Sequence, residues 1–291
     1  MTIERDIQPL APANPERLDE IARQLLEKDT KPESHSAKKS AKPEIAIPQG
    51  VFILKYDMPG KEWITKANEM FAGTAAEIPA FEKDEEAHTM HFLRRAALTT
   101  AAYKNTNLKS AGILPITPLM SEQLLKAKKT PKKPGDYCEV LALLLYDRSE
   151  TGQNPKEAKV LYESLKSHRT ELGLSESDLD ERLLIIDAGL EKDEQMPHGV
   201  RLVALPGLTT AYAHETLKKT GQDYNFTYGL EHGLPSANKL GRGKRTLYMP
   251  DENENIGLRV LYRYRDLDLY ARYWDLAVQD GAGRVAVARR A

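Results

Sequence analysis

The residues best suited to chemistry lie near the end of the chain, where aromatic, arginine and aspartate side chains gather. Four of the 13 tyrosines and one of the two tryptophans fall between residues 262 and 274. From residue 257 to residue 291 there is no lysine and no glutamate, although both are common earlier in the chain. Tyr, Trp, Arg and Asp together are typical of a recognition surface, because rigid aromatic rings bring contact area at little entropic cost. This composition predicts a surface that binds a ligand.

The pattern of this stretch is that of β-strands. Residues 260–264 and 267–273 carry aliphatic or aromatic side chains at near-alternate positions, and residues 284–288 alternate with valine. Gly281 and Gly283 predict a tight turn before the last strand. We therefore expect a β-meander that finishes in a hairpin. Its buried frame is expected to consist of Leu267, Leu269, Ala271, Leu276 and Ala277.

The opposite face of the meander is the predicted ligand-binding surface. A second interpretation is that the aromatic residues are core or cross-strand pairs of an amphipathic sheet. The two interpretations differ in whether the aromatic rings project outward. The predicted ligand-binding residues are Tyr264, Asp266, Asp268, Tyr270, Arg272, Tyr273, Trp274, Asp275 and Asp280.

The stretch resembles the variable region of the variable proteins made by diversity-generating retroelements. Those proteins have a C-type-lectin-like fold and bind ligand with one hypervariable surface, which arises when template adenines are randomised during reverse transcription. The lack of Lys and Glu, both encoded by adenine-rich codons, agrees with this. The resemblance implies a hypervariable region at about 258–288. Its matching frame is Gly257-Leu258-Arg259, Leu267, Leu269, Ala271, Leu276-Ala277, Gly283-Arg284-Val285 and Val287.

A second resemblance involves residues 255–260, which read Asn-Ile-Gly-Leu-Arg-Val. They look like the closing Ile-Gly-Phe-Arg-Val signature of formylglycine-generating-enzyme-like lectin folds. Leu258 stands where that signature has an aromatic residue, and the motif precedes the suspected variable stretch instead of following it. This resemblance implies an alternative function as an enzyme or accessory module related to that fold. A structural protein of a phage or virus is a further alternative.

Histidines offer two weak candidates for metal chemistry. His88 and His91 share a predicted helix face with Glu85 nearby, but no further ligand signature accompanies them. The pair at 214–215, His-Glu, lacks the second histidine of a zinc-protease helix, because Lys218 stands in its place. We therefore predict no metal site.

Two polar loops complete the search for chemistry. Residues 241–245, Gly-Arg-Gly-Lys-Arg, lack the spacing of a phosphate-binding loop, so we interpret them as a basic surface loop. Residues 251–255 offer oxygen ligands but lack the spaced ligands and glycine of a calcium loop. With no catalytic set and no cofactor motif, the prediction is a binding protein that is not an enzyme and holds no cofactor.

Length and composition narrow the class of protein. A chain of 291 residues with 41% hydrophobic content can bury a large core, and its net charge of -1 argues against a general nucleic-acid binder. The single cysteine, Cys138, excludes an internal disulfide. No apolar run is long enough to span a bilayer, and residues 1–10 are too charged for a signal peptide. These features predict a cytoplasmic or virion-associated protein.

Two parts of the chain are expected to differ in order. Residues 14–28 predict a short helix, and residues 28–44 are a Lys-, Ser- and Pro-rich flexible linker. Because so short a helix is marginal alone, residues 1–44 serve either to dock on a partner or second copy, or as a strap on their own domain. Residues 45–291 are expected to form one α+β, C-type-lectin-like ligand-binding domain with short β-strands and flanking helices.

Local patterns predict individual elements of that domain. Residues 137–146 are strongly apolar and fit either a buried helix or a central strand. Asn154 and Pro155 fit the cap and first position of a helix, and the turn-rich residues 224–250 form an irregular region before the final strands. Strands are predicted at 51–56, 183–186 and 200–205, and helices at 62–71, 82–104 and 154–171.

Overall fold

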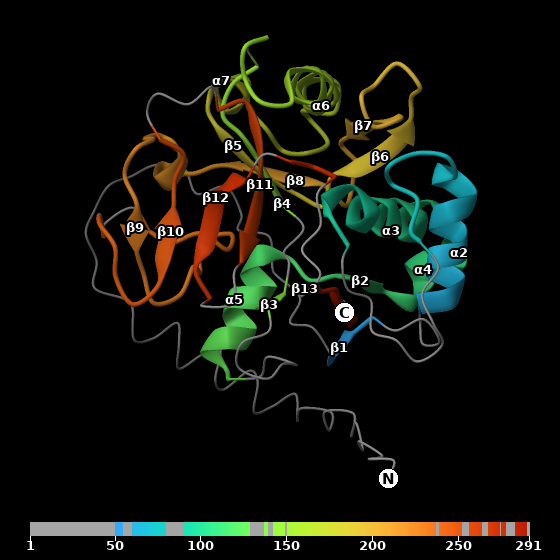
Figure 1. The fold of residues 1–291 in the computed structure, drawn as a ribbon, viewed down its shortest axis with the longest axis horizontal. Helices are drawn as coiled ribbons and strands as arrows, with labels where there is room; N and C mark the ends of the chain where they lie inside the picture. The colour runs from blue at the N-terminus through green and yellow to red at the C-terminus, as the bar shows by residue number, and fades with distance from the viewer. Residues whose placement is uncertain are drawn as a thin grey trace.

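The protein is α+β, as the sequence predicts, with helices packed beside a mixed β-sheet (Figure 1). The predicted helix and linker within 1–44 lie outside the described residues. Among the residues described, none of the helices combines the length and apolar character needed to cross a membrane. The computed structural model describes residues 50–54, 60–79, 90–128, 137–138, 142–148, 150–236, 239–251, 256–263, 267–273, 275–277 and 283–289.

A seven-stranded sheet lies at the centre of the molecule, with the strand order β8-β5-β4-β11-β12-β10-β9. Its pairs are antiparallel except for β10 with β12, which run parallel. A register shift between Val260 and Tyr262 marks a bulge where β11 meets β12. The strands are β4 (Ala142–Leu145), β5 (Leu183–Ile186), β8 (Thr210–Ala213), β9 (Tyr224–Asn225), β10 (Thr246–Tyr248), β11 (Leu258–Arg263) and β12 (Leu269–Tyr273).

The described residues of the apolar run at 137–146 include two strands and no helix. It contains β3 (Tyr137–Cys138) and β4, and β4 pairs with β5 on one side and with β11 on the other. All four residues of β4 are buried, because both faces of the sheet are covered there. A strand covered on both faces reads as a continuous apolar run, so its sequence pattern could not be told from that of a buried helix.

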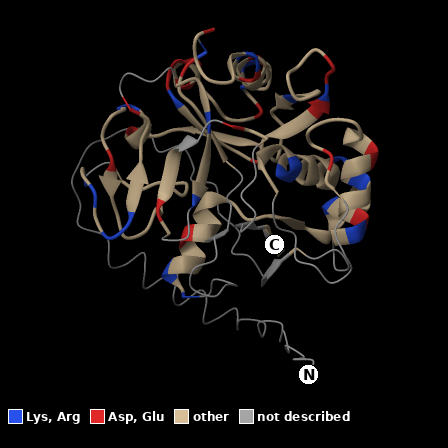
Figure 2. Cartoon of the chain, in the orientation of Figure 1, with Lys and Arg blue, Asp and Glu red and all other residues tan. Residues whose placement is uncertain are grey.

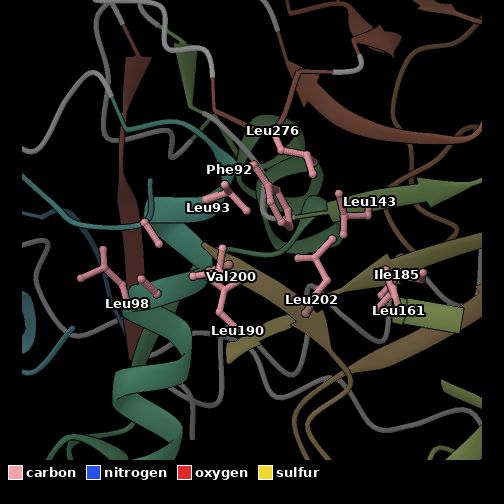
Figure 3. Close-up of a cluster of buried hydrophobic side chains, with 14 of the residues drawn as sticks. Phe92, Leu93, Leu98, Leu143, Leu161, Ile185, Leu190, Val200, Leu202 and Leu276 are labelled. Atoms are coloured by element: carbon pink, nitrogen blue, oxygen red, sulfur yellow. The ribbon is translucent and has the colours of Figure 1, made fainter. Parts of the chain in front are cut away.

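One face of the large sheet packs against helices and the hairpin β6 (Gly189–Lys192) with β7 (Val200–Val203). Figure 3 shows part of this core, with Phe92 of α3, Leu143 of β4 and Leu202 of β7 among its members. The helices are α2 (Gly60–Phe71), α3 (Phe92–Lys104), α4 (Thr106–Ala111), α5 (Pro118–Lys126), α6 (Pro155–Ser167) and α7 (Glu176–Asp180).

The other face of the sheet has a second core. Leu144, Leu184 and Leu247 project from the strands to this side and meet Tyr224 and Leu234. Those two partners come from the predicted turn-rich region at 224–250, which crosses this face and also holds β9 and β10. This region therefore adds two strands to the edge of the sheet and also contributes Leu234 to the second core.

One helix starts later than the sequence predicts, and a second starts as predicted but without the expected side-chain cap. The helix predicted at 82–104 begins at Phe92 in the described part of the chain, because the backbone at His91 is extended. Asn154 is the N-cap residue of α6 as predicted, but its side chain makes no capping bond. Its amide Nδ2 instead donates to the carbonyl oxygen of Leu258 at 3.0 Å, which ties α6 to β11.

The predicted hairpin at the end of the chain is wrong. The last strand, β14 (Ala286–Arg289), pairs with β1 (Gly50–Ile53) and β2 (Ile113–Pro115) in a separate three-stranded sheet. The short β13 (Gly283–Arg284) pairs in parallel with β3. Alternating apolar residues determine which side chains of a strand are buried but not which strand lies beside it, so local pattern could not reveal this pairing.

Candidate functional site

Three tyrosines stack across three neighbouring strands of the large sheet. Tyr248 of β10 is the register partner of Tyr270 of β12, which in turn pairs with Tyr262 of β11. The ring centroids of Tyr248 and Tyr270 lie 4.6 Å apart, and those of Tyr262 and Tyr270 lie 5.2 Å apart. Interplanar angles of 22° and 25° make both contacts stacked. We call these three half-buried residues the tyrosine ladder.

The tyrosine ladder lies on the face of the sheet opposite to the second core. Leu247, Leu261 and Leu269 precede the three tyrosines along their strands and are buried in that core. Since neighbouring residues of a strand point to opposite faces, the tyrosine rings point the other way. In Figure 1 helices α2, α3 and α6 lie away from β10 and β12, whereas α5 lies near them.

An arginine stands at the β9 end of the tyrosine ladder. The guanidinium of Arg242 lies 5.3 Å from the ring centroid of Tyr248, which is cation–π distance. Its Nε donates to Oδ2 of Asp223 at 2.8 Å, and this hydrogen bond and the Asp223 charge raise the pKa of Arg242. Arg242 thus stays cationic and is held beside the outermost ring.

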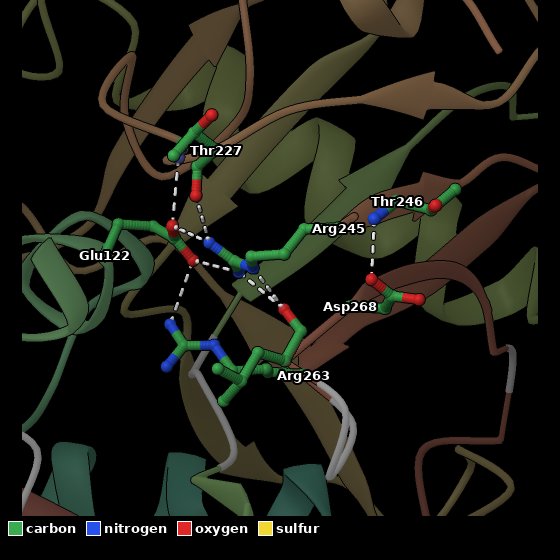
Figure 4. A network of polar contacts seen from close by, with 8 residues as sticks. Glu122, Thr227, Arg245, Thr246, Arg263 and Asp268 are labelled. Atoms are coloured by element: carbon green, nitrogen blue, oxygen red, sulfur yellow. Dashed lines mark hydrogen bonds and ion pairs between the residues drawn. The ribbon is translucent and has the colours of Figure 1, made fainter. Parts of the chain in front are cut away.

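A buried carboxylate joins residues next to the strands that carry the tyrosine ladder (Figure 4). Glu122 of α5 is fully buried and accepts two hydrogen bonds from Arg245, with Nη1 to Oε2 at 2.7 Å and Nη2 to Oε1 at 3.0 Å. Arg263 of β11 donates Nη2 to Oε1 at 3.1 Å, and the backbone N–H of Gly229 donates to Oε2 at 2.9 Å. We call Glu122, Arg245 and Arg263 the arginine clamp. Such bidentate, charge-assisted bonds offset much of the cost of burying these charges.

The arginine clamp also fixes the backbone that leads into β12. Arg245 Nε donates to the carbonyl oxygen of Leu267 at 2.8 Å, and Arg245 Nη1 donates to that of Thr227 at 3.0 Å. Leu267 has a φ of 72°, a left-handed conformation that is uncommon outside glycine and needs support from its surroundings. The clamp therefore sets the course of the chain three residues before Tyr270.

Asp268 corrects one prediction for the binding face. It is 8% exposed, and its Oδ1 accepts a hydrogen bond from the backbone N–H of Thr246 at 2.6 Å. The expected outward position of this carboxylate is therefore wrong, because it is used to join the start of β12 to β10. Asp275 is half-buried, and its Oδ1 accepts from the backbone N–H of Ala277 at 2.8 Å.

The other predicted binding residues fall into three groups. Tyr270 belongs to the tyrosine ladder, where cross-strand stacking coexists with partial exposure, so both sequence interpretations apply to it. Arg272 and Tyr273 lie on β12, where only their backbone is described. The residues outside the described part of the chain are Tyr264, Asp266, Trp274 and Asp280.

The predicted frame is largely confirmed. Leu269, Ala271 and Leu276 are at most 1% exposed. Leu267 and Ala277 are only half-buried. Leu267 differs from the predicted buried position because its positive φ turns the chain before β12 begins.

Sequence reasoning missed most of the geometry of the candidate site. Tyr248 and Tyr262 join the ladder through strand pairing, which local pattern does not reveal. Arg245 was expected in a basic surface loop, but it is 8% exposed and its charge is used inside the arginine clamp. The signal that could have found the tyrosines is the apolar residue immediately before each one, Leu247 and Leu261.

Two histidines are buried and neutral. Burial is the largest cause that lowers the pKa of His91 to about 3, helped by the charges of Arg94, Arg95 and His198. Burial likewise lowers the pKa of His214 to about 4. His88 and Glu85, the other members of the weak metal candidate, lie outside the described residues. Within the described part of the chain no three His, Cys, Asp or Glu residues are placed to hold a metal.

Comparisons with protein-family models, with curated proteins and with solved structures find no match to this chain.

From the arginine clamp we predict that replacing its single carboxylate strongly lowers the stability of the fold. Replacing Glu122 by Gln leaves two buried guanidinium groups without their carboxylate, which should lower the free energy of unfolding by roughly 3–5 kcal/mol. Denaturant titration measures this loss. The matched control is Glu163→Gln on the exposed side of α6, which should stay within about 0.5 kcal/mol of the parent. Equal stability of the two variants would show that the cluster does not hold the sheet.

The buried histidines predict acid sensitivity. Their folded-state pKa values of about 3 and about 4 lie below the ordinary value of 6.5, so the unfolded chain binds protons first as pH falls. The stability that they contribute is complete above pH 6.5 and is lost as pH falls from there towards 3 or 4. Thermal melts at stepped pH should show a shallower loss for His91→Gln than for the parent. His168→Gln, on the surface of the helical layer, should follow the parent.

Proposed function

We propose that the protein is a non-enzymatic ligand-binding protein that recognises a protein partner through the tyrosine ladder and the adjoining residues 264–280. The observation that carries this proposal is the stacking of Tyr248, Tyr270 and Tyr262 in a half-exposed row. Tyrosine is enriched where proteins bind one another, because it offers a large rigid contact area with a polar tip.

Ring orientation favours a polypeptide over a sugar or a base as the ligand. Tyr270 has a neighbouring ring on both sides, and Tyr248 has Tyr270 on one side and the Arg242 guanidinium against its ring. Ligands that bind by stacking need open ring faces. A ladder whose faces contact one another presents ring edges, which suit the mixed apolar and polar contacts of a protein interface.

Rigidity supports the same function. The arginine clamp and the Asp268–Thr246 bond hold β10, β11 and β12 together beneath the tyrosine ladder. A surface that is already ordered loses less conformational entropy on binding, so more of its contact energy appears as affinity.

The finer identity of the protein is part of the proposal. We infer a C-type-lectin-like display protein, cytoplasmic or virion-associated, whose residues 258–288 are diversified by a retroelement, with residues 14–28 as a docking segment. Tyr262, Tyr270 and the predicted binding residues around them all lie in that range, which supports the inference. Sequencing the genomic neighbourhood tests the origin: we expect a near-repeat of the DNA for residues 258–288 that differs only at adenines, beside a reverse transcriptase gene. A neighbourhood with neither feature contradicts the diversification.

Selection from a displayed library of random linear and cyclic peptides tests the binding function. We expect the parent protein to enrich peptides that a Tyr248→Ser/Tyr262→Ser/Tyr270→Ser variant no longer binds. The control is Tyr103→Ser on α3, a half-buried tyrosine remote from the ladder, which should bind as the parent does. Equal binding by the ladder variant, or no enrichment by the parent, contradicts the proposal.

Stability measurements separate lost binding from lost folding. Each stacking contact of the ladder contributes about 0.5–1.5 kcal/mol beyond the burial of ring area, and the rings are only half-buried. We therefore expect the ladder variant to be less stable than the parent but still folded at the start of a denaturant titration. Leu269→Ala, on the opposite face of β12, should cost about 2–5 kcal/mol as a core truncation. If the triple variant fails to fold, the single variant Tyr248→Ser at the end of the row provides the binding test.

A further inference from the structure

The loop that leads into β10 continues the surface of the tyrosine ladder. Residues 239–244 are all exposed and include three cations, Lys239, Arg242 and Lys244. Leu240, between two of them, is 55% exposed and is one of two large apolar side chains that stand open among the described residues. We call residues 239–244 the basic loop. Figure 2 shows Lys and Arg positions in blue along the part of the chain that Figure 1 labels β9 and β10.

Hydrogen bonds hold the basic loop in one shape. The backbone N–H of Gly241 donates to the carbonyl of Asp223 at 2.8 Å, and that of Asn225 donates to the carbonyl of Lys239 at 3.0 Å. Gly243 packs so closely on Asn225 that a Cβ there would lie 2.5 Å from the Cβ of Asn225. The cations and Leu240 are thus presented from an ordered backbone, as in a binding loop on a rigid scaffold.

The charge of the basic loop is only partly neutralised. Asp223 pairs with Arg242 at 2.8 Å, and Asp251 is a second carboxylate near enough to raise the pKa of Arg242. Among the residues that the structure describes, neither Lys239 nor Lys244 forms an ion pair with a carboxylate. The ammonium groups of Lys239 and Lys244 can therefore pair with anionic groups of a ligand.

We propose that the basic loop extends the tyrosine ladder and selects an acidic polypeptide as the partner, an inference that rests on the proposed function. In the complex, partner carboxylates pair with Lys239 and Lys244, an apolar side chain of the partner packs on Leu240, and the rest of the segment crosses the ring edges from Tyr248 to Tyr262. Charge complementarity of this kind mainly sets partner choice and the rate of encounter.

A polypeptide fits this surface better than a nucleic acid. Binding single strands combines a charged track along the backbone with open aromatic faces on which bases stack. Here the faces of Tyr270 are occupied by its two neighbours, and the chain as a whole carries a net charge of -1. The exposed Leu240 also favours a partner with apolar side chains.

Peptides selected on the parent protein from the same displayed library test this inference. We expect them to be enriched in Asp and Glu and to bind more weakly as salt is raised. A Lys239→Ser/Lys244→Ser variant should lose about tenfold in affinity for them and most of the salt dependence. The matched control, Lys159→Ser/Lys166→Ser on the exposed side of α6, should bind as the parent does. Unchanged denaturation midpoints for both variants confirm that folding is intact.

The outcomes separate this inference from the proposed function. Peptides that are neutral or basic, yet require the tyrosine ladder, overturn the acidic partner and leave the proposed function standing. Peptides that bind without the ladder overturn both. Tighter binding of single-stranded oligothymidylate than of any acidic peptide, lost in the Lys239→Ser/Lys244→Ser variant, replaces the polypeptide with a nucleic acid and overturns the inference.

Discussion

The arrangement of the candidate site depends on one buried carboxylate. Glu122 sits in α5 far along the chain from its partners, yet Arg245 precedes β10 and Arg263 ends β11, so one side chain joins three elements. Burying these charges is costly unless each finds its partners, and the fork of Arg245 meets that condition with the carboxylate and two backbone carbonyls. The arginine clamp can therefore form only when α5, β10, β11 and the chain before β12 lie in one arrangement relative to each other.

The tyrosine ladder follows from that placement. Strand β12 lies between β11 and β10 in the sheet, although it follows both of them in the sequence. The chain must therefore reverse direction after β11 and run back between the two earlier strands. Leu267 makes this return with a positive φ and is held by Arg245, and Asp268 fastens the new strand to Thr246. Once β12 is inserted, Tyr270 stands between Tyr248 and Tyr262, and stacking is the natural contact for rings at these spacings. The arginine clamp lies on one side of the strands and the proposed recognition surface on the other.

Several elements were predictable because their causes are local. Trp63, Ile64, Ala67 and Phe71 recur at helical spacing and give α2, and β5 is an unbroken apolar run at the residues predicted. The frame of β12 was also visible, since Leu269 and Ala271 alternate along a strand. Errors appear where a distant partner decides the outcome. Asn154 stands at the predicted N-cap of α6, but its side chain makes no capping bond and its amide donates to the carbonyl of Leu258 instead. The expected final hairpin gives way to the pairing of β14 with β1 and β2.

By itself the sequence determined the α+β class, the buried frame of the C-terminal strands and the concentration of tyrosine, arginine and aspartate near the chain end. These depend on composition and on periodicity, which are properties of neighbouring residues. Only the tertiary structure decided that Asp268 and Arg245 turn inward while Tyr248 joins Tyr270. The reason is physical: a charged side chain is exposed by default, and it becomes buried only where strands and helices from elsewhere in the chain supply the opposite charge and the hydrogen bonds that replace water.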